Sequence, residues 1–318
     1  MSFAGGGSDL PPFYRRFGGA VVSTAVNQFV YVTVNKKFDD HIRVSYSRTE
    51  NARSVPRIRH PLVREAMQML GIHGGVEITS VADIPAKGTG LGSSSSFTVG
   101  LLHALHAYAE CHASAEQLAR EACEIEIERC GEPIGKQDQY AAAFGGLNFI
   151  QFKPDDSVVV EPIICRRQTI EQLQSHLVTF YTGITRSASG LLAHQQKAMA
   201  SEKKKQSVMR RMVDQADTLR RQLQRNDLSG LGELLHEGWE LKKTLAAGIS
   251  SDVIDGWYAQ ARKAGAVGGK LLGAGAGGFL VFYAPPERHE AIARALPKLR
   301  RMNFRFEPQG SRIIFVHQ

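Results

Sequence analysis

The 318-residue sequence contains few cysteines, and none of them forms a C-x-x-C pair. With only Cys111, Cys123, Cys130 and Cys165 present, neither a zinc site nor a disulfide framework is expected, and reduced thiols in a cytoplasmic protein are the default. The chain also lacks a run of about 18 apolar residues, which excludes a membrane-spanning helix. No basic segment followed by an apolar stretch stands at the start, so no signal peptide is expected.

The charge and the placement of aromatic residues bear on the kind of partner, and they argue against nucleic acid. The formal net charge of +8 is compatible with nucleic acid, an anionic membrane or anionic small molecules, and charge alone does not choose among them. However, the basic stretch 203–221 lacks the interleaved aromatic residues of a nucleic-acid platform. We therefore expect small-molecule substrates, with no nucleic acid and no membrane as partner.

The composition is that of a globular protein, with 43% hydrophobic and 22% charged residues. Strand and helix patterns mix without a regular βαβ rhythm, which predicts an α+β fold. The length predicts two domains. A turn-rich interruption near 151–170 places them at 1–160 and 161–318. The expected strands are 20–34, 42–47, 76–80, 146–152, 157–164, 177–181, 278–283 and 311–316, and the expected helices are 96–110, 114–129, 188–225, 229–246, 252–264 and 287–301.

Glycine is the residue in excess, and its clustering is informative. The segment 85–96, PAKGTGLGSSSS, leads directly into the expected helix at 96–110. Glycines let the backbone approach a ligand, and the helix start adds unpaired N–H donors and a positive dipole end. Four successive hydroxyls extend the donor set. The segment predicts a polyphosphate site, but it is not a Walker A loop, because no lysine follows the last glycine.

Two further glycine segments lie near the ends of the chain. Residues 268–278, GGKLLGAGAGG, contain a G-x-G-x-x-G match, yet they lead into the expected strand 278–283 rather than a helix. The dinucleotide interpretation is therefore rejected. Residues 3–12, FAGGGSDLPP, taken alone would be a flexible turn.

Taken together and in this order, the three segments resemble the GHMP small-molecule kinases, which include galactokinase, homoserine kinase and mevalonate kinase. The stretches FAGGGSDLP at 3–11, GKQDQY at 135–140 and TGITRS at 182–187 look closest to the D-glycero-D-manno-heptose 7-phosphate kinases within that family. The resemblance implies a two-domain α+β kinase with its active site in the cleft between the domains. It also implies ATP and Mg²⁺ as cofactors.

The resemblance implies roles for individual residues. Asp138 would be the catalytic base, and Lys136 is a candidate cation to hold it ionised, although the two could equally form a structural ion pair. Ser94 and Glu126 would hold magnesium, with Glu124 and Glu128 as alternatives to Glu126. The nucleotide would bind Lys87, Gly88, Gly90, Leu91, Gly92, Ser93, Ser94 and Ser95, and the sugar substrate would bind Ser8, Asp9, Arg186, Gly275 and Gly277. Arg186 would bind a substrate phosphate, with a surface arginine at a strand end as the alternative.

The start of the chain departs from the family pattern. Family members carry a short strand before the first glycine turn and an arginine nine residues before the position of Asp9, which here would be residue zero. We therefore expect the natural chain to begin upstream of Met1. The alternative is that this chain is the natural one, lacks an edge strand and the arginine, and works poorly.

The function implied by the resemblance is ATP-dependent phosphorylation of the anomeric hydroxyl of D-glycero-D-manno-heptose 7-phosphate. The product would feed nucleotide-activated heptose for lipopolysaccharide or capsule synthesis. Two alternatives remain: a kinase for an unphosphorylated sugar such as L-fucose, and a non-catalytic sugar and nucleotide sensor on the same fold.

Overall fold

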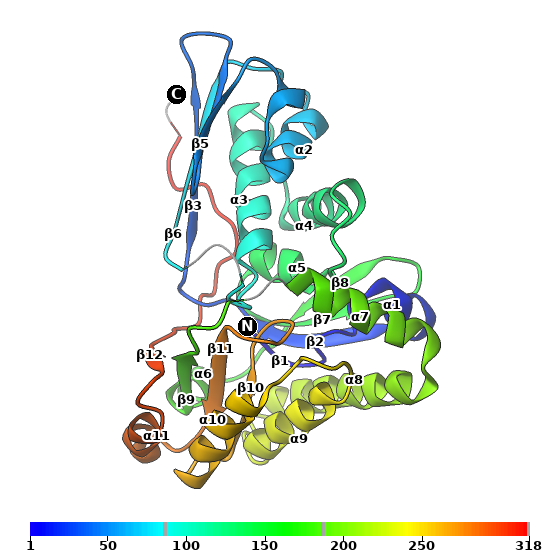
Figure 1. Cartoon of the computed structure of the whole chain (residues 1–318), viewed down its shortest axis with the longest axis vertical. Coiled ribbons are helices and arrows are strands. Elements are labelled where there is room, and N and C mark those ends of the chain that lie inside the picture. The colour runs from blue at the N-terminus through cyan, green and yellow to red at the C-terminus, as the bar shows by residue number, and fades with distance from the viewer. Residues whose placement is uncertain (85–87, 186–187, 317–318) are drawn as a thin grey trace.

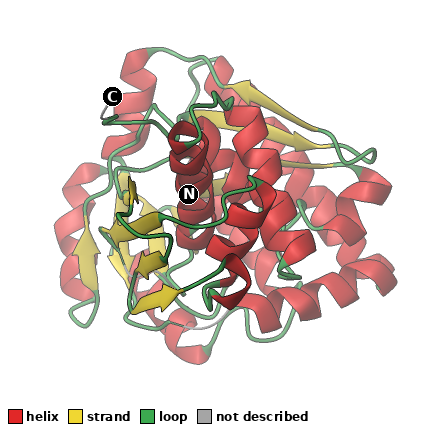
Figure 2. Cartoon of the chain, turned by 90° about the horizontal axis from the view of Figure 1, so that it is seen from above, coloured by secondary structure: helices red, strands yellow, loops and turns green. Residues whose placement is uncertain are grey.

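The computed structural model describes residues 1–84, 88–185 and 188–316. Two of the expected site residues, Lys87 and Arg186, lie outside these ranges. The fold is α+β, as predicted, with three four-stranded sheets among the described residues (Figure 1). Seen from above, two groups of strands lie apart with helices between them (Figure 2).

The first sheet forms the upper part of the molecule in Figure 1, with helices along one face. Its strand order is β3-β6-β4-β5, with β3 at one edge. Alternating apolar residues such as Val76 and Ile78 of β6 point into the core beneath α3, where they meet Leu102. The strands are β3 (Val30–Lys36), β6 (Val76–Ala82), β4 (Ile42–Ser45) and β5 (Thr49–Ala52); the adjoining helices are η1 (Val55–Arg57), α2 (Pro61–Met69), α3 (Ser93–Tyr108) and α4 (Ala115–Cys123).

The second sheet crosses the middle of the molecule and is antiparallel throughout. Every residue of its strand β2 is buried, because helices contact it. The strands are β1 (Ser2–Ala4), β2 (Gly19–Thr24), β7 (Leu147–Phe152) and β8 (Val158–Pro162); the nearby helices are α1 (Pro11–Phe17), α5 (Gln137–Phe144), α7 (Ala188–Ser201) and α8 (Lys203–Gln224). A short strand therefore does precede the first glycine turn, within residues that the sequence analysis counted as part of the turn motif.

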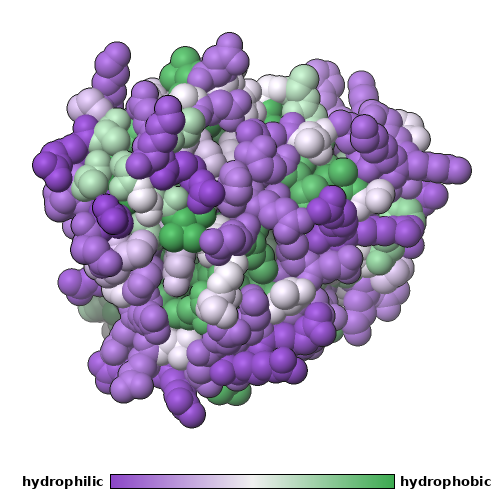
Figure 3. Space-filling view, turned by 90° about the horizontal axis from the view of Figure 1, so that it is seen from below, coloured by the Kyte–Doolittle hydropathy of each residue, from purple (hydrophilic) through white to green (hydrophobic). Residues whose placement is uncertain are grey.

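The third sheet lies in the lower part of the molecule and has the order β10-β11-β9-β12. Its strands are β9 (Leu177–Tyr181), β10 (Gly268–Leu271), β11 (Phe279–Tyr283) and β12 (Arg300–Met302); its helices are α6 (Arg167–Ser175), α9 (Leu231–Lys243), α10 (Asp252–Lys263), η3 (Pro286–Arg288) and α11 (His289–Ala295). Helix α9 packs closely on β10, since a Cβ added at Gly268 would lie 1.8 Å from the carbonyl oxygen of Gly232. The face seen from below is mostly hydrophilic, with small separate apolar patches (Figure 3).

Several expected elements have different limits. The expected strand 20–34 is two strands in different sheets, because Ala25 and Asn27 pair with Gly146 and Arg305 instead of continuing one ladder. The expected helix 188–225 is broken at Glu202, whose φ and ψ of −99° and 103° are extended. The expected helix 287–301 contains η3, α11 and the start of β12.

The expected strand 311–316 is wrong. After β12 the chain returns to the first half of the sequence, where Glu307 pairs with Ala25 and the Ser311 N–H donates to the carbonyl of Ala142 over 3.0 Å. Beyond Ser311 the chain climbs beside α3 and β3 toward the C-terminus (Figure 1) without joining a sheet. The consecutive apolar residues Ile313–Val316 therefore do not form a strand. Among the described residues, no helix combines the length and hydrophobicity needed to cross a bilayer.

Candidate active site

The first glycine segment forms an open loop at the N-terminus of α3. Gly88, Gly90 and Gly92 have φ values of 73°, 74° and 69°, a region that favours glycine, which explains why they alternate in the sequence. Gly92 is the N-cap residue, and no side chain caps the helix there. The positive end of the helix dipole therefore points toward this loop, an arrangement that favours an anion, as expected for a phosphate loop.

Behind this loop, one buried carboxylate accepts hydrogen bonds from three hydroxyl groups of α3. Glu126 is only 1% exposed. Its Oε1 accepts hydrogen bonds from Ser94 (2.8 Å) and Thr98 (3.1 Å), and its Oε2 accepts from Ser95 (2.8 Å) and Gln139 (2.5 Å). Burial raises the pKa of Glu126, and these donors oppose that rise. Ser93 lies on the other side of the loop, with its hydroxyl 3.2 Å from that of Thr89.

The local helix geometry selects Glu126 among its acidic neighbours. Residues Glu124–Arg129 form a π-helical turn, η2, which is a rare form that often marks functional sites. Within it, Glu124 forms an ion pair with Arg129 at 2.7 Å, and Glu128 is exposed. Only Glu126 of the three contacts Ser94 among the described interactions.

The pair Ser94 and Glu126 suits magnesium. Their oxygens lie 2.8 Å apart, and adjacent ligands of an octahedral ion with bonds of 2.0–2.1 Å are about 2.9 Å apart. The Ser94 side chain is exposed to the solvent side of the loop, whereas Ser95 is buried. No group of three or more His, Cys, Asp or Glu residues in the described ranges forms an alternative metal cluster.

Asp138 lies in the first turn of α5 and faces the start of α3. A Cβ added at Gly92 would lie 3.1–3.3 Å from atoms of the Asp138 side chain, so the carboxylate rests against the end of the phosphate loop. It also lines a cavity of about 1420 Å³. The surrounding protein raises the pKa of Asp138, while the Met1 amino group and Lys242 lower it.

The expected partner of Asp138, Lys136, is engaged elsewhere. Its Nζ donates to the carbonyl oxygen of Asp156 at 2.9 Å and lies 3.3 Å from the Asp156 carboxylate and 5.0 Å from the centre of the Tyr14 ring. Lys136 therefore anchors the β7–β8 turn and is not the partner of Asp138. Lys136 stands just before α5, which begins at Gln137, whereas Asp138 lies within that helix.

Asp9 lies in the first glycine turn, beside the start of α5. Its Oδ1 accepts the Gly7 N–H at 3.1 Å and its Oδ2 accepts the Gln137 N–H at 3.0 Å. Burial, reinforced by Asp138, raises the pKa of Asp9 to about 6. The neighbouring Ser8 exchanges two hydrogen bonds with the backbone of Ala20 (3.0 and 3.1 Å), so its hydroxyl ties the turn to β2.

The two large glycine loops touch each other through their backbones. A Cβ added at Gly273 would lie 2.3 Å from the Cα of Gly90, and one at Gly278 would lie 2.2 Å from the carbonyl oxygen of Thr89. The second loop leads into strand β11, so the rejection of a dinucleotide fingerprint is confirmed. In this second loop, Gly275 packs against the backbone of Ile249, and Gly277 packs against Ile184.

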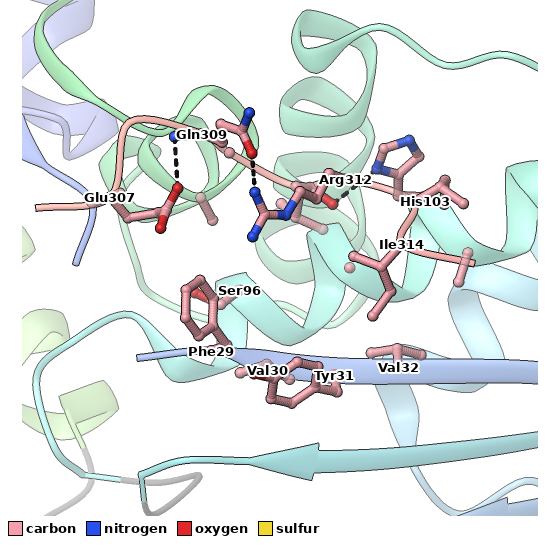
Figure 4. A pocket seen from close by; sticks show the side chains of 18 of the residues that line it. Phe29, Val30, Tyr31, Val32, Ser96, His103, Glu307, Gln309, Arg312 and Ile314 are labelled. Atoms are coloured by element: carbon pink, nitrogen blue, oxygen red, sulfur yellow. Dashed lines mark hydrogen bonds between the residues drawn. The ribbon is translucent and has the colours of Figure 1, made fainter. Parts of the chain in front are cut away.

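A cavity of about 1420 Å³ extends from Asp138 and Gly92 along α3. Figure 4 shows its walls. One wall is formed by β3, with Val30, Tyr31 and Val32, and by Phe29 just before it. The opposite wall is the C-terminal segment, with Glu307, Gln309, Arg312 and Ile314. The wall is tied to α3 by His103 Nδ1 and Ser311 Oγ, 2.9 Å apart. The sequence analysis did not foresee this wall, because it treated the C-terminal segment as a strand.

Two family profiles match this chain. The profile "GHMP kinases N terminal domain" matches residues 60–146, and "GHMP kinases C terminal" matches residues 219–300, together more than half of the chain. The chain belongs to the GHMP kinase family. The first profile covers the phosphate loop, Glu126 and Asp138, whereas Asp9 lies outside both.

Several named proteins are similar to this GHMP kinase over most of its length. D-glycero-alpha-D-manno-heptose 7-phosphate kinase of Campylobacter jejuni is 28% identical over 94% of this chain and 91% of its own. L-fucokinase/L-fucose-1-P guanylyltransferase of Bacteroides fragilis is 25% identical over 89% of this chain and 34% of its own. The structure of a D-glycero-D-manno-heptose 1-phosphate kinase from Bacteroides thetaiotaomicron has a TM-score of 0.79 at 28% identity and covers 98% of this chain and 94% of its own.

These similarities confirm the resemblance noted from the three glycine segments. The chain is an ATP-dependent sugar kinase with the two-domain GHMP fold. A galactokinase of Lactococcus lactis complexed with galactose has a TM-score of 0.77 at 16% identity, which shows a shared fold alone.

One site residue of this GHMP kinase escaped the sequence analysis as a candidate. Lys242 near the end of α9 is 6% exposed, and its Nζ donates to the carbonyl oxygen of Gly273. Burial lowers its pKa to about 8, while Asp9 and Asp138 raise it. The only sequence signal was a lysine one turn after the apolar position Trp239, which a solvated helix face would also give.

Proposed function

We propose that this GHMP kinase transfers the γ-phosphoryl group of ATP to the anomeric hydroxyl of a D-glycero-D-manno-heptose phosphate. The observation that carries the proposal is the placement of Asp138 against Gly92 at the start of α3, where a carboxylate and a phosphate-binding helix end meet. The sugar is proposed from the two relatives named as heptose phosphate kinases, each 28% identical over nearly the whole chain.

Each residue contributes a defined step. The N–H groups at the start of α3 bind the phosphates of ATP, and the absence of side chains at Gly88, Gly90 and Gly92 lets the phosphates come close to the backbone. Asp9 accepts hydrogen bonds from sugar hydroxyls, and Asp138 orients the attacking hydroxyl and accepts its proton. Ser94 and Glu126 would hold Mg²⁺, which neutralises charge on the phosphates when it is bound.

The position of the phosphate already on the sugar is part of the proposal. The Campylobacter relative is named for a 7-phosphate substrate and the Bacteroides relative for a 1-phosphate. We propose the 7-phosphate as acceptor and the 1,7-bisphosphate as product, following the name of the Campylobacter relative, which matches 94% of this chain. An unphosphorylated sugar such as L-fucose is the second candidate, because a fucokinase is among the relatives over 89% of this chain.

Phosphorus NMR of the products tests the proposal. The protein is incubated with magnesium ATP and D-glycero-D-manno-heptose 7-phosphate, and in parallel with L-fucose or with D-glycero-D-manno-heptose 1-phosphate. We expect a new anomeric phosphate resonance with the 7-phosphate alone. If only L-fucose gives product, the substrate is an unphosphorylated sugar instead of the heptose phosphate. If the 1-phosphate gains a phosphate at C7, the hydroxyl that accepts the phosphoryl group is the one at C7 instead of the anomeric one. A sensor on this fold would turn over none of the three.

A further inference from the structure

Gln139 directly follows Asp138 in the first turn of α5, yet its side chain contacts a different carboxylate. Gln139 is fully buried, and its Nε2 donates to Oε2 of Glu126 over 2.5 Å. The Asp138 side chain instead rests against Gly92, because successive residues of a helix point about 100° apart. One turn of α5 therefore contacts both the phosphate loop and the carboxylate proposed to hold magnesium.

The four hydrogen bonds of Glu126 divide unequally between its two oxygens. Oε2 accepts from Ser95 and Gln139, and both of these donors are buried. Oε1 accepts from the buried Thr98 and from Ser94, which is exposed. The enclosed oxygen is thus fixed by two donors, and this leaves the other oxygen beside the exposed hydroxyl of the loop.

The other end of the Gln139 amide shows that an apolar side chain would be less costly for folding. Within the part of the chain that the structure describes, Oε1 of Gln139 is buried and accepts no hydrogen bond. A buried acceptor without a donor costs free energy, which an apolar side chain of similar size would avoid. What the amide supplies is the hydrogen bond to Glu126. As a neutral donor, it orients the carboxylate without cancelling the negative charge that a metal ion requires.

We propose that Gln139 is a positioning residue, whose amide fixes Oε2 of Glu126 so that Oε1 stays beside the Ser94 hydroxyl. The inference rests on the proposed function, in which Ser94 and Glu126 would hold Mg²⁺. Partners that hydrogen-bond to a metal ligand set its orientation, and their loss typically weakens metal affinity or activity by about 10–100-fold. Because Asp138 and Gln139 are adjacent, the base and this support of the metal carboxylate are positioned by the same helix.

The first test removes the amide but keeps the length of the side chain, in Gln139→Met. Gln206→Met is the matched control, since Gln206 is also buried and its Nε2 donates over 2.8 Å to the carbonyl of Met199, which joins α8 to α7. Titration calorimetry measures the affinity for a non-hydrolysable ATP analogue with Mg²⁺ and without it. Release of ADP is followed over a magnesium titration with the sugar that gives product in the NMR assay, and thermal melting reports folding.

We expect Gln139→Met to affect only the measurements that involve the metal. The gain in affinity that Mg²⁺ gives to the nucleotide analogue should fall roughly 10-fold, and the Mg²⁺ concentration for half-maximal rate should rise by a similar factor. Affinity for the metal-free analogue and the KM for the sugar should stay within about twofold of wild type, and Gln206→Met should match the wild type throughout. A merely structural role would lower the affinity equally with and without Mg²⁺.

A reciprocal exchange separates the hydrogen bond from the position of the charge. Glu126→Gln/Gln139→Glu again pairs one amide with one carboxylate, but the carboxylate now belongs to α5. We expect this double variant to melt above Gln139→Glu, in which two carboxylates face each other in a buried place. It should nevertheless keep the impaired magnesium response of Glu126→Gln. A wild-type magnesium response of the double variant would overturn the inference, because the charge would then act from either position.

The two proposals fail in different ways. A Gln139→Met protein whose magnesium response lies within about twofold of wild type would overturn the role of Gln139, as would equal losses of affinity with and without Mg²⁺. If Gln139→Met melts below the assay temperature, Gln139→Leu is judged by the same criteria. A wild-type magnesium response of Glu126→Gln would instead remove the proposed magnesium pair itself. An impaired Glu126→Gln beside a normal Gln139→Met would overturn only the role of Gln139.

Discussion

The Ser94 hydroxyl donates to Oε1 of Glu126 over 2.8 Å, which joins the first turn of α3 to the π-helical turn η2. The two residues are 32 positions apart in the sequence. The carboxylate of Glu126 lies beneath the first turn of α3, whereas Glu124 pairs with Arg129 and Glu128 is exposed.

This geometry predicts that Glu126→Gln impairs the use of magnesium. An amide is a weaker ligand for Mg²⁺ than a carboxylate, and it cannot accept all four hydrogen bonds that Glu126 receives. We expect kcat to fall roughly 10²-fold and the Mg²⁺ concentration for half-maximal rate to rise. Magnesium titration of ADP release measures both. The exposed Glu128→Gln should behave like the wild type, and an equal effect of the two would contradict the assignment.

Substitutions of two adjacent serines should separate an effect on catalysis from an effect on stability. Ser94 is exposed and Ser95 is buried, although both donate to Glu126. We expect Ser94→Ala to weaken magnesium-dependent turnover with little change in stability. Ser95→Ala should lower the free energy of unfolding by about 1–2 kcal/mol, since it removes a buried bond to a carboxylate. Urea unfolding and steady-state kinetics check the pair, and the reverse pattern would make Ser94 a structural residue.

Asp138→Asn should separate binding from chemistry. The amide keeps the shape of the side chain against Gly92 but cannot accept a proton. We expect turnover to fall roughly 10²–10⁴-fold while ATP binding survives, as measured by ADP release and titration calorimetry. Lys136→Met is the matched control from the same segment, because Lys136 contacts Asp156 instead of the site. A variant that loses ATP binding as well would place Asp138 in the nucleotide site.

Local patterns in the sequence predicted the α+β class, which the structure has, and they predict a phosphate loop at the start of α3. Alternating glycines before a helix indicate a phosphate loop directly, since the loop and the helix are continuous. The pairing of Ser94 with Glu126 followed from a family resemblance, and the hydrogen bond between them agrees with it. Both features, the glycine loop and the Ser94–Glu126 pair, could be predicted because a sequence motif marks them.

Other features depend on contacts between distant segments. The partner of Asp138 was expected at Lys136, two positions away, but Lys136 pairs with Asp156. The cations that lower the pKa of Asp138 are the Met1 amine and Lys242, each more than a hundred positions away in the sequence. The split of 20–34 into two strands has the same cause, because Ala25 pairs with Glu307 of the returning C-terminal segment. Periodicity reports which residues are apolar, and it does not report which distant backbone will pair with them.

Contact between the glycine loops predicts the effect of Gly90→Ala. A Cβ at Gly90 would lie 2.5 Å from the carbonyl oxygen of Leu272, and the φ of 74° is unfavourable for alanine. Gly71→Ala is a matched control, with a φ of 65° and open space around its Cβ. Both should lose about 1–2 kcal/mol from the backbone conformation. Only Gly90→Ala should also lower kcat, by about 10²-fold, because it displaces the two loops. Equal kinetics for both variants would show that the loop contact is dispensable.

The pH dependence of kcat/KM for the sugar should be bell-shaped. The pKa of Asp9 is raised to about 6, so below that pH its carboxyl becomes protonated and cannot accept from two sugar hydroxyls at once. The pKa of Lys242 is lowered to about 8, so above that pH its ammonium loses the proton and no longer favours ionised Asp138. Activity should therefore rise through about 6 and fall above about 8. Because a sugar phosphate also titrates at a pKa of about 6, Asp9→Asn decides the origin of the acid limb. An acid limb that persists unchanged in Asp9→Asn belongs to the substrate or to another group, and a basic limb that persists in Lys242→Met does not belong to Lys242.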